Sequence, residues 1–336
     1  MTRMKQGGID LVIPWVDGND SAWRMQRDEY AECAGVRIRD SLYRDWGLLR
    51  YWFRGVEQNL PWIRKVHFIT YGHLPAWLNT DHPKLNIVRH IDYMPKEYLP
   101  TFSSIPIETN VHRIKELSEY FITANDDTYF IGPVTPKEYF QDGLPCDCLS
   151  IVPITELCTD SFGHILWNNI ACINRHFDMQ DCAKKHEEKW FCAQYTQEIV
   201  QRNKAMLSWK SFPGLGKNHY PNAVLKSVYE EVWKKEHKLL NNTSEHRFRD
   251  EKDVSNWLMR YWQLASGRFV PYMQEGRASV CVGDEPRRIK EVILNTNNRI
   301  ICINEGQDEV DFESRARYIR ELFEMRLPEM SSYEKF

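Results

Sequence analysis

The fold is decided by one short stretch of the sequence, YFITANDD at residues 120–127. Its first five residues form an apolar run that is typical of a buried β-strand. Its last three, Asn125-Asp126-Asp127, are residue types that end strands and form turns. Three earlier segments have the same character and predict three more strands, at residues 10–16, 64–70 and 85–91.

Segments with helical spacing separate these strands. Apolar residues recur at three- and four-residue steps over 45–60, and a second helix is expected from Ser104 to about residue 117. Strands that alternate with helices imply parallel βαβ units. We therefore predict an α/β protein with a mostly parallel sheet and flanking helices. Sites in such sheets lie beyond the carboxyl ends of the strands, where Asp17 and Asp126-Asp127 fall.

The second half of the chain is more helical. Helices are expected over 178–205, 222–238, 253–266 and 312–327, and a pair of strands over 291–294 and 299–303. No linker or internal repeat divides the sequence, so we expect one composite domain over residues 1–336. Within it, an α/β half at 9–150 would be joined by a mainly helical half at 151–336 that completes the site.

Composition excludes several classes of protein. Lys and Arg total 44 against 47 Asp and Glu, a net charge of −3, which argues against a nucleic-acid partner. No apolar stretch approaches the roughly 20 residues of a membrane span, and residues 1–8 lack the apolar core of a signal peptide. Nine irregularly spaced cysteines fit a reducing compartment. These features predict a cytoplasmic globular protein.

Two acidic turns are candidate sites. Asp126 and Asp127 could hold a hard divalent cation such as Mg²⁺, or they could simply end a strand. Trp15-Val16-Asp17-Gly18 could stack a base or sugar in a loop that approaches closely, or it could be a tight turn over a buried Trp15. The sequence contains no glycine-rich phosphate loop of the dinucleotide-binding or P-loop type.

Basic and histidine residues supply further candidates. Glu108 and His112 stand four residues apart on the expected helix, with Arg113 beside them, and could orient an anionic substrate or form a surface ion pair. His219 and Arg249 suit phosphate recognition, because a guanidinium matches phosphate oxygens with two donors. Cys146 and Cys148 form an isolated CxC pair that fits no zinc pattern.

In combination these segments form four ordered regions between residues 9 and 305. They read IPWVDGND (13–20); RD (44–45), RY (50–51), PWIRK (61–65), PAWLN (75–79), LPTFSS (99–104), IE (107–108), HRI (112–114) and NDD (125–127); HYPNA (219–223) with SEHRFR (244–249); and CINE (302–305). The set resembles the signature regions of the Stealth family of sugar-1-phosphate transferases. That family includes bacterial capsule polymerases and the catalytic subunit that tags lysosomal glycoproteins with N-acetylglucosamine phosphate.

The chain departs from the family pattern at four positions. Trp46 and Leu48 stand where the family usually has Asn and Glu. Asn222 replaces a common second histidine of the third region, and Glu305 replaces the usual Asp of the fourth.

The resemblance implies a reaction, a fold and partners. A hexose-1-phosphate or N-acetylhexosamine-1-phosphate would pass from a UDP-sugar to a hydroxyl of an acceptor glycan, leaving a phosphodiester and releasing UMP. The core would be similar to that of GT-A nucleotide-sugar glycosyltransferases, with the nucleotide sugar bound by residues 9–150. Mg²⁺ or Mn²⁺ would be the cofactor. The reaction would be a step of bacterial surface-polysaccharide synthesis. One form of the acceptor would be a lipid-linked glycan at the inner face of the membrane.

The resemblance also implies roles for individual residues. Asp127 is the expected base and Asp126 the expected metal ligand, although the two roles could be exchanged; Asn304 and Glu305 would complete the metal site. His219 and Arg249 would contact the transferred phosphate or the leaving nucleotide. The residues expected to bind nucleotide and substrate are Trp15, Asp17, Gly18, Asp45, Arg50, Glu108, His112 and Arg113.

Three other functions use the same residues differently. An ordinary metal-dependent glycosyltransferase would break the sugar C1–O bond and release UDP. A phosphoesterase would use the carboxylates and His219 but transfer to water. A carbohydrate-binding protein would use the aromatic residues, 13% of the chain, and leave the acidic pair idle.

Overall fold

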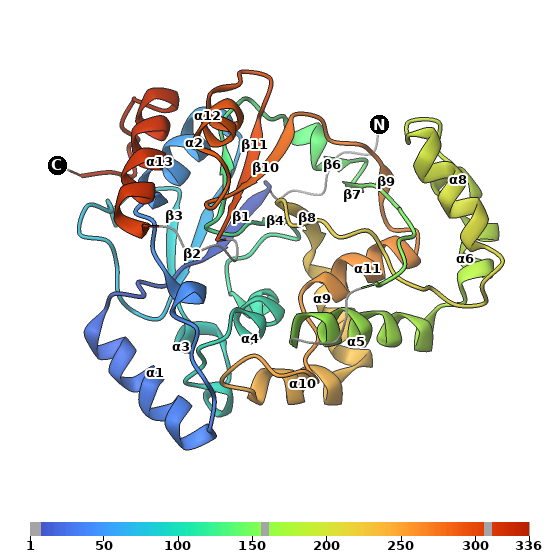
Figure 1. Ribbon diagram of the computed structural model, residues 1–336. Helices are drawn as coiled ribbons and strands as arrows, with labels where there is room; N and C mark the ends of the chain where they lie inside the picture. The colour runs from blue at the N-terminus through green and yellow to red at the C-terminus, as the bar shows by residue number, and fades with distance from the viewer. Residues whose placement is uncertain (1–7, 156–160, 306–310, 336) are drawn as a thin grey trace.

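The computed structural model describes residues 8–155, 161–305 and 311–335 (Figure 1). Residues 1–7, which form most of the segment expected to lack a signal peptide, lie outside the described residues. Helices and strands are mixed along the chain, which confirms the α/β class. The likeness to a GT-A core stays a prediction.

A five-stranded sheet forms the centre of the molecule. Its strands are β1 (Asp10–Pro14), β2 (Val66–Thr70), β3 (Leu85–Arg89), β4 (Tyr120–Thr123) and β8 (Asn222–Leu225), in the order β3-β2-β1-β4-β8. The first four are the strands expected from the sequence, and they pair in parallel. β1, β2 and β4 are almost wholly buried, as apolar runs in a covered parallel sheet should be.

The fifth strand corrects the sequence analysis. The segment 222–238 was expected to be one helix, but Asn222–Leu225 forms β8, antiparallel to β4, before helix α9 (Lys226–Lys235) begins. A run as short as Ala223-Val224-Leu225 cannot be assigned to helix or strand by its periodicity. Pairing with the edge of β4 decides its conformation.

A second sheet contains β10 (Arg277–Cys281), β11 (Ile300–Asn304) and β5 (Thr128–Phe130). The strand expected at 299–303 is therefore present, but the partner expected at 291–294 is wrong. Those residues belong to helix α12 (Pro286–Leu294), which begins with proline in its first turn and buries Ile289 and Ile293 on one face. β11 pairs instead with β10 in parallel and with β5 antiparallel.

The remaining elements surround these sheets. A small sheet joins β6 (Phe140–Gln141), β7 (Leu144–Asp147) and β9 (Val270–Pro271). The other helices are α1 (Ser21–Ala34), α2 (Leu49–Asn59), α3 (His90–Tyr93), α4 (Ser104–Thr109), α5 (Ser161–His176), α6 (Met179–Lys185), α7 (Glu187–Trp190), α8 (Gln197–Met206), α10 (His237–Glu245), α11 (Trp257–Ala265) and α13 (Phe312–Arg326), with short 3-10 turns at Asp40–Tyr43, Lys96–Tyr98, Val111–Arg113 and Pro136–Glu138.

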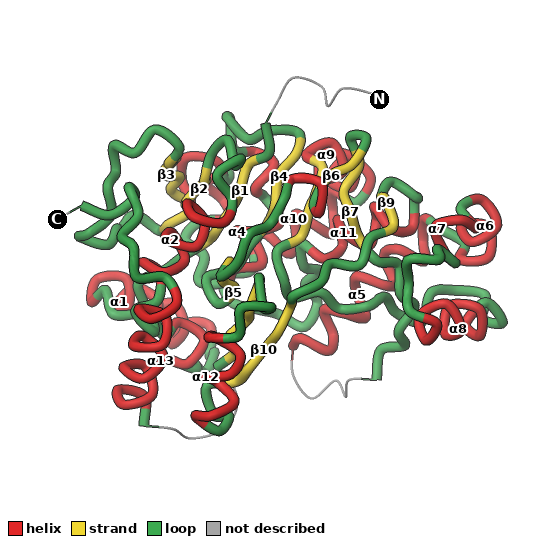
Figure 2. Tube along the Cα trace, turned by 90° about the horizontal axis from the view of Figure 1, so that it is seen from above, coloured by secondary structure: helices red, strands yellow, loops and turns green. Residues whose placement is uncertain are grey.

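Two expected helices are shorter than their spacing suggested. The segment 178–205 is divided into α6, α7 and α8, and α4 ends at Thr109 instead of continuing to about residue 117. The helices at 45–60, 253–266 and 312–327 are confirmed as α2, α11 and α13. α6 and α8 lie at the opposite end of the molecule from α13 (Figures 1 and 2). None of the helices in the described part of the chain has the length and apolar composition needed to cross a membrane.

A single cluster of buried apolar side chains extends through both sheets and the helices on them. It includes Trp52 of α2, Trp190 of α7 and Trp262 of α11, all fully buried. A smaller cluster of Trp23, Ala31, Phe102 and Phe248 lies under α1. Much of the chain's aromatic content is therefore core packing, the alternative to sugar stacking.

An ion pair secures the C-terminal segment to α2. The Glu334 side chain has no exposed area and accepts a 2.9 Å hydrogen bond from Arg54 Nε. Arg54 also donates to the carbonyl of Leu327 at 2.9 Å and to Glu324 at 3.0 Å. Burial by itself would raise the pKa of Glu334, but the bonds from Arg54 and from the Ser331 backbone outweigh it and lower the pKa.

We expect Arg54→Met to lower the free energy of unfolding at pH 7 by about 3–5 kcal/mol, because it leaves Glu334 charged and buried. The folded-state pKa of Glu334 is lowered, so the pair stabilises fully above the unfolded value near 4.5 and its contribution is lost as pH falls through the folded pKa. Urea denaturation at pH 7 and at a pH well below 4.5 measures the loss of stability and its dependence on pH. The control, Arg287→Met, removes a 90% exposed arginine and should leave stability unchanged. Equal effects of the two variants would contradict the prediction.

Candidate active site

The turn after β4 meets the loop that precedes β8. Because β8 is antiparallel to β4, its first residue, Asn222, pairs with Thr123 at the end of β4. The loop residue His219 is therefore brought to Asp127 although 92 positions separate them, and its Nε2 lies 2.8 Å from Asp127 Oδ2. The two residues expected to act at the site are in direct contact.

The end of β11 joins the same turn. Cys302 pairs with Thr128 across the antiparallel ladder, and the Ile303 N–H donates to the Asp127 carbonyl at 2.9 Å. Continuing that register places Asn304 opposite Asp126. The ligand atoms of Asp127, His219 and Cys302 all lie within 4.8 Å of one another, so the Cys302 thiol stands beside the Asp127 carboxylate.

Carboxylates from three parts of the chain are close enough to influence one another. Asp126 reaches solvent, but the surrounding protein removes part of its hydration. This desolvation, followed by the charges of Asp127 and Asp45, raises the pKa of Asp126 to about 7. Burial likewise raises the pKa of Asp45, and Asp17 adds to the effect. The turns after β1, after the 3-10 turn Asp40–Tyr43 and after β4 thus converge.

Glu108 is half-buried at the end of α4 and lines a small recess with Asn125, His219 and Asn256. Burial raises the pKa of Glu108 to about 7, against the lowering effects of the Ser104 hydrogen bond, Arg249 and His219. Arg249 therefore lies within electrostatic range of this recess. Of the residues expected from the sequence, the structure brings together Asp17, Asp45, Glu108, Asp126, Asp127, His219, Arg249 and Asn304.

The donor set fits a hard divalent cation. Mg²⁺ and Mn²⁺ take carboxylate and amide oxygens, which Asp126 and Asn304 supply. After desolvation, the charges of Asp127 and Asp45 raise the pKa of Asp126, and a bound cation would relieve this repulsion. Asp127 Oδ1 is buried and accepts no hydrogen bond within the described ranges, so it is available to an ion or to a substrate proton.

Glu305 is already engaged by other side chains. Its two oxygens accept hydrogen bonds from Arg44, at 2.5 Å, and from the indole N–H of Trp46, at 2.8 Å. The Trp46 ring packs on Phe312 with centroids 4.7 Å apart. Trp46 and Glu305 are two of the four departures from the family pattern, and here they contact each other. Both oxygens of Glu305 are therefore engaged, whereas the side-chain oxygen of Asn304 accepts only a weak 3.4 Å bond from the Cys302 thiol among the described residues.

The turn after β1 corrects the stacking hypothesis for Trp15. Its ring is only 7% exposed and packs on Phe68 and on the edge of His73, so it cannot present a face to a base. The Asp17 N–H donates to His73 Nε2 at 2.8 Å, which holds the turn against β2. Gly18 is required by packing, because a Cβ there would lie 1.8 Å from the Tyr43 carbonyl oxygen.

Three other residues expected to bind a ligand have contacts within the protein, and the binding role of Arg50 and Arg113 stays a prediction. His112 lies on a 3-10 turn beyond the end of α4, so it does not share a face with Glu108. It packs on the rings of α9, and burial, followed by the charge of Arg113, lowers the pKa of His112 to about 3. Arg113 stands 4.6 Å from the Trp233 ring. Arg50 stands 5.1 Å from the Trp77 ring and 4.0 Å from Glu334.

The sequence analysis missed two residues at the site. Cys302 was quoted in the fourth region without a role, and only the β5–β11 ladder shows that it contacts Asp127. Arg320 lies near Asp45 and donates to the Trp46 carbonyl at 3.2 Å. No motif marks Arg320, because it is one of several arginines on α13.

Comparisons with known proteins show the family of the chain. The family model of Stealth protein conserved region 1 matches residues 7–32, and that of conserved region 2 matches residues 42–146. A capsular polysaccharide phosphotransferase, WcwK, of Streptococcus pneumoniae is 35% identical over 100% of both chains. The receptor polysaccharide phosphotransferase WefC of Streptococcus gordonii is 35% identical over 97% of this chain and 98% of its own.

A third relative and one solved structure complete the comparison. The exopolysaccharide phosphotransferase cps2G of Lactiplantibacillus plantarum is 33% identical over 97% of this chain and 96% of its own. The apo structure of the bifunctional glycosyltransferase WbbM aligns with 96% of this chain and 52% of that chain, at 11% identity and a TM-score of 0.35, too low to support an argument.

The fold, the acidic turns and the relatives define an enzyme of the transferase class. The chain belongs to the Stealth family.

We expect His219 to titrate above its usual pKa of 6.5, because its hydrogen bond to Asp127 favours the imidazolium. The stability gained from this pair is fully present below pH 6.5 and is lost as pH rises through the folded-state value. Asp127→Asn removes the charge and should lower the pKa of His219. Histidine C–H NMR titration measures the shift, with His237, remote in sequence on α10, as the internal control. An unchanged titration in Asp127→Asn would contradict the pairing.

Proposed function

We propose that the chain transfers a hexose-1-phosphate or N-acetylhexosamine-1-phosphate from a UDP-sugar to a hydroxyl of an acceptor glycan in bacterial surface-polysaccharide synthesis. The product is a phosphodiester, and UMP is released. Membership of the family and the names of the relatives support phosphotransfer in polysaccharide synthesis. The observation that carries the proposal is the convergence of Asp126, Asp127 and His219 at one turn, with Arg249 within electrostatic range of the neighbouring Glu108.

The transfer exchanges one P–O bond for another. The acceptor hydroxyl oxygen attacks the phosphorus that bears the sugar, and the bond from that phosphorus to the bridging oxygen breaks, so UMP leaves with the bridging oxygen. Asp127 accepts the hydroxyl proton at Oδ1, the buried oxygen that has no other partner in the described part of the chain. His219 donates to Oδ2 of the same carboxylate, which orients Asp127.

Positive charge is needed where the transferred phosphoryl group gathers negative charge. Arg249 supplies a two-donor guanidinium within electrostatic range of Glu108, which lines the recess with His219. A bound Mg²⁺ or Mn²⁺ would supply further positive charge at the phosphate oxygens, and Asp126 and Asn304 are the residues that would hold it. Asp17 and Asp45 lie toward β1 and are assigned to the nucleotide side. A cytoplasmic location, with the acceptor at the inner face of the membrane, stays a prediction.

The ordinary glycosyltransferase remains the second candidate, because it would use the same donor and the same acidic turn. The two reactions differ in the bond that breaks: a glycosyltransferase cleaves C1–O and leaves both phosphates on UDP. A phosphoesterase would need no acceptor and would release a sugar phosphate to water.

The nucleotide product decides between these reactions. We expect UMP as the immediate product and the sugar-linked phosphorus in a diester when purified enzyme, UDP-sugar and acceptor glycan are followed by phosphorus NMR. Omitting the acceptor should stop UMP release, which separates transfer from hydrolysis. UDP as the sole nucleotide product would assign the chain to the ordinary glycosyltransferases.

The metal site makes a second prediction. Asp126→Asn should lower kcat by at least about a hundredfold, the typical cost of losing one electrostatic contact in a transition state, without changing the melting temperature. EDTA should abolish turnover, and Mg²⁺ or Mn²⁺ should restore it. Asp181→Asn, at a side chain that is 80% exposed on α6, is the matched control and should behave as wild type. Full activity in EDTA would remove the metal from the mechanism.

A further inference from the structure

A cavity of about 370 Å³ lies beside the candidate active site, within the range of about 300–1,000 Å³ that small-ligand sites occupy. Its walls come from β7, β10, α11 and the loop 216–222 that carries His219. Tyr220 and Asn222 line both this cavity and the recess of Glu108 and His219, so the two hollows share a wall. We call the cavity of about 370 Å³ the β10 pocket.

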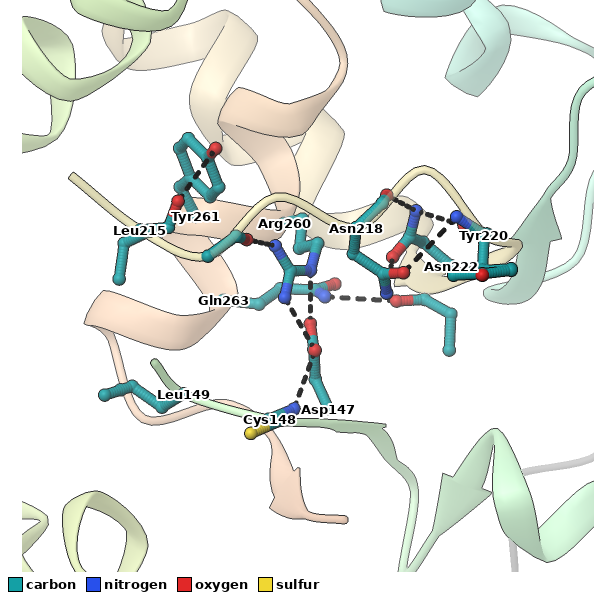
Figure 3. A network of polar contacts seen from close by, with 12 residues as sticks. Asp147, Cys148, Leu149, Leu215, Asn218, Tyr220, Asn222, Arg260, Tyr261 and Gln263 are labelled. Carbon is teal, nitrogen blue, oxygen red and sulfur yellow. Dashed lines mark hydrogen bonds and ion pairs between the residues drawn. The ribbon is translucent and has the colours of Figure 1, made fainter. Parts of the chain in front are cut away.

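Most charged groups of the β10 pocket are already paired. Arg260 donates to both oxygens of Asp147, at 2.7 and 2.8 Å, and to the Gly216 carbonyl at 2.6 Å (Figure 3). Both side chains are nearly buried, at 5% and 11% exposed. Glu138, a second acid of the wall, lies 2.8 Å from Arg299. These acids are therefore committed to arginines other than Arg277.

Arg277 is the exception. Its guanidinium donates to the amide oxygens of Asn218, at 3.2 Å, and of Gln274, and it stands 5.0 Å from the Tyr220 ring. It forms no ion pair with a carboxylate of the described residues, and its buried Nε has no acceptor among them. The buried Nε2 of Gln274 also lacks an acceptor there. Burial lowers the pKa of Arg277, as expected for a cation removed from water without a counter-ion.

Arg277 is half-buried, and a cation partly removed from water without a counter-ion is costly, so proteins normally pair such a charge. A ligand can supply the counter-ion that Arg277 lacks, because a guanidinium presents two parallel donors to a carboxylate or phosphate. Tyr220 and Tyr272 add aromatic faces to the same wall, which suit the apolar face of a sugar. The wall thus combines one cation that lacks a counter-ion among the described residues, Arg277, with aromatic surfaces that suit a carbohydrate.

The sheet order separates the β10 pocket from the turns assigned to the nucleotide. β8 lies on the opposite side of β4 from β1, so the loop before β8 is separated by β4 from Asp17 and the nucleotide side. Ser279 of β10 is the register partner of Cys302, which contacts Asp127. Arg277 stands two residues from Ser279, or about 7 Å along the strand. When one sugar of the acceptor glycan has its hydroxyl at Asp127, the next sugar of the same glycan would therefore lie near Arg277.

We propose that the β10 pocket binds an acidic group of the acceptor glycan, a carboxylate or a phosphodiester, through Arg277. The proposal rests on the proposed function for the identity of the ligand as acceptor. The two candidate groups have the same chemistry: each gives the sugar a single negative charge, which would pair with the guanidinium of Arg277.

Binding of small glycosides tests the proposal without any transfer reaction. The probes are methyl glucuronide, a methyl glucoside that carries a methyl phosphodiester, and neutral methyl glucoside, each titrated by calorimetry into the full chain. We expect at least one charged probe to bind tenfold or more tightly than the neutral one, and the tighter of the two identifies the acidic group. Arg277→Gln should abolish this preference, while Arg287→Gln, which removes an exposed arginine of α12, should retain it.

Thermal melting gives an independent readout. Arg277→Gln removes an unpaired charge and should melt no lower than wild type, whereas Arg260→Gln breaks the buried pair with Asp147 and should melt lower. Equal binding of charged and neutral probes by wild type, or an unchanged preference in Arg277→Gln, would overturn the proposal. So would displacement of the charged probe by UDP, which would place the pocket on the nucleotide side. If the chain prefers the charged probe but releases no UMP, the proposal for the β10 pocket stands and the proposed reaction is contradicted.

Discussion

The antiparallel ladder between β4 and β8 is the constraint on which the active site depends. Parallel strands β1, β2 and β4 deliver their carboxyl ends to one edge of the sheet, but by themselves they bring only acidic turns. Reversal of direction at β8 places the start of that strand at the end of β4, and His219 comes with it. The β5–β11 ladder then adds Cys302 and Asn304 from the other side.

Electrostatics distinguishes this candidate site from the structural ion pairs of the protein. Two buried acids of this protein have a dedicated arginine: Glu334 has Arg54, and Asp147 has Arg260. Asp126 has none among the described residues, and desolvation, followed by the neighbouring carboxylates, raises its pKa. Like charges held together, without a structural gain, are typical of a place where a cation or a proton is handled during function. Arg277 shows the same imbalance with the opposite sign.

The departures from the family pattern also have a physical account. The longer side chain of Glu305 and the indole N–H of Trp46 meet in a 2.8 Å hydrogen bond, supported by Arg44 and by packing of Trp46 on Phe312. Two substitutions that look independent along the sequence therefore form one contact. The pair joins the segment before α2 to the end of β11, next to the turn of Asp126.

The sequence by itself determined the four parallel strands, the helices α2, α11 and α13, and the residue types of the acidic turn, because periodicity and turn chemistry act over a few neighbours. It also selected Asp127 and His219 through family motifs. It failed at β8, at 291–294 and at His112, where runs of about four residues are compatible with either helix or strand, or where a helix ends early. Tertiary structure decided those segments, the burial of Trp15 and the contacts of Cys302 and Arg277. Pairing across a sheet and the absence of a counter-ion depend on residues far apart in the chain, and no local pattern records them.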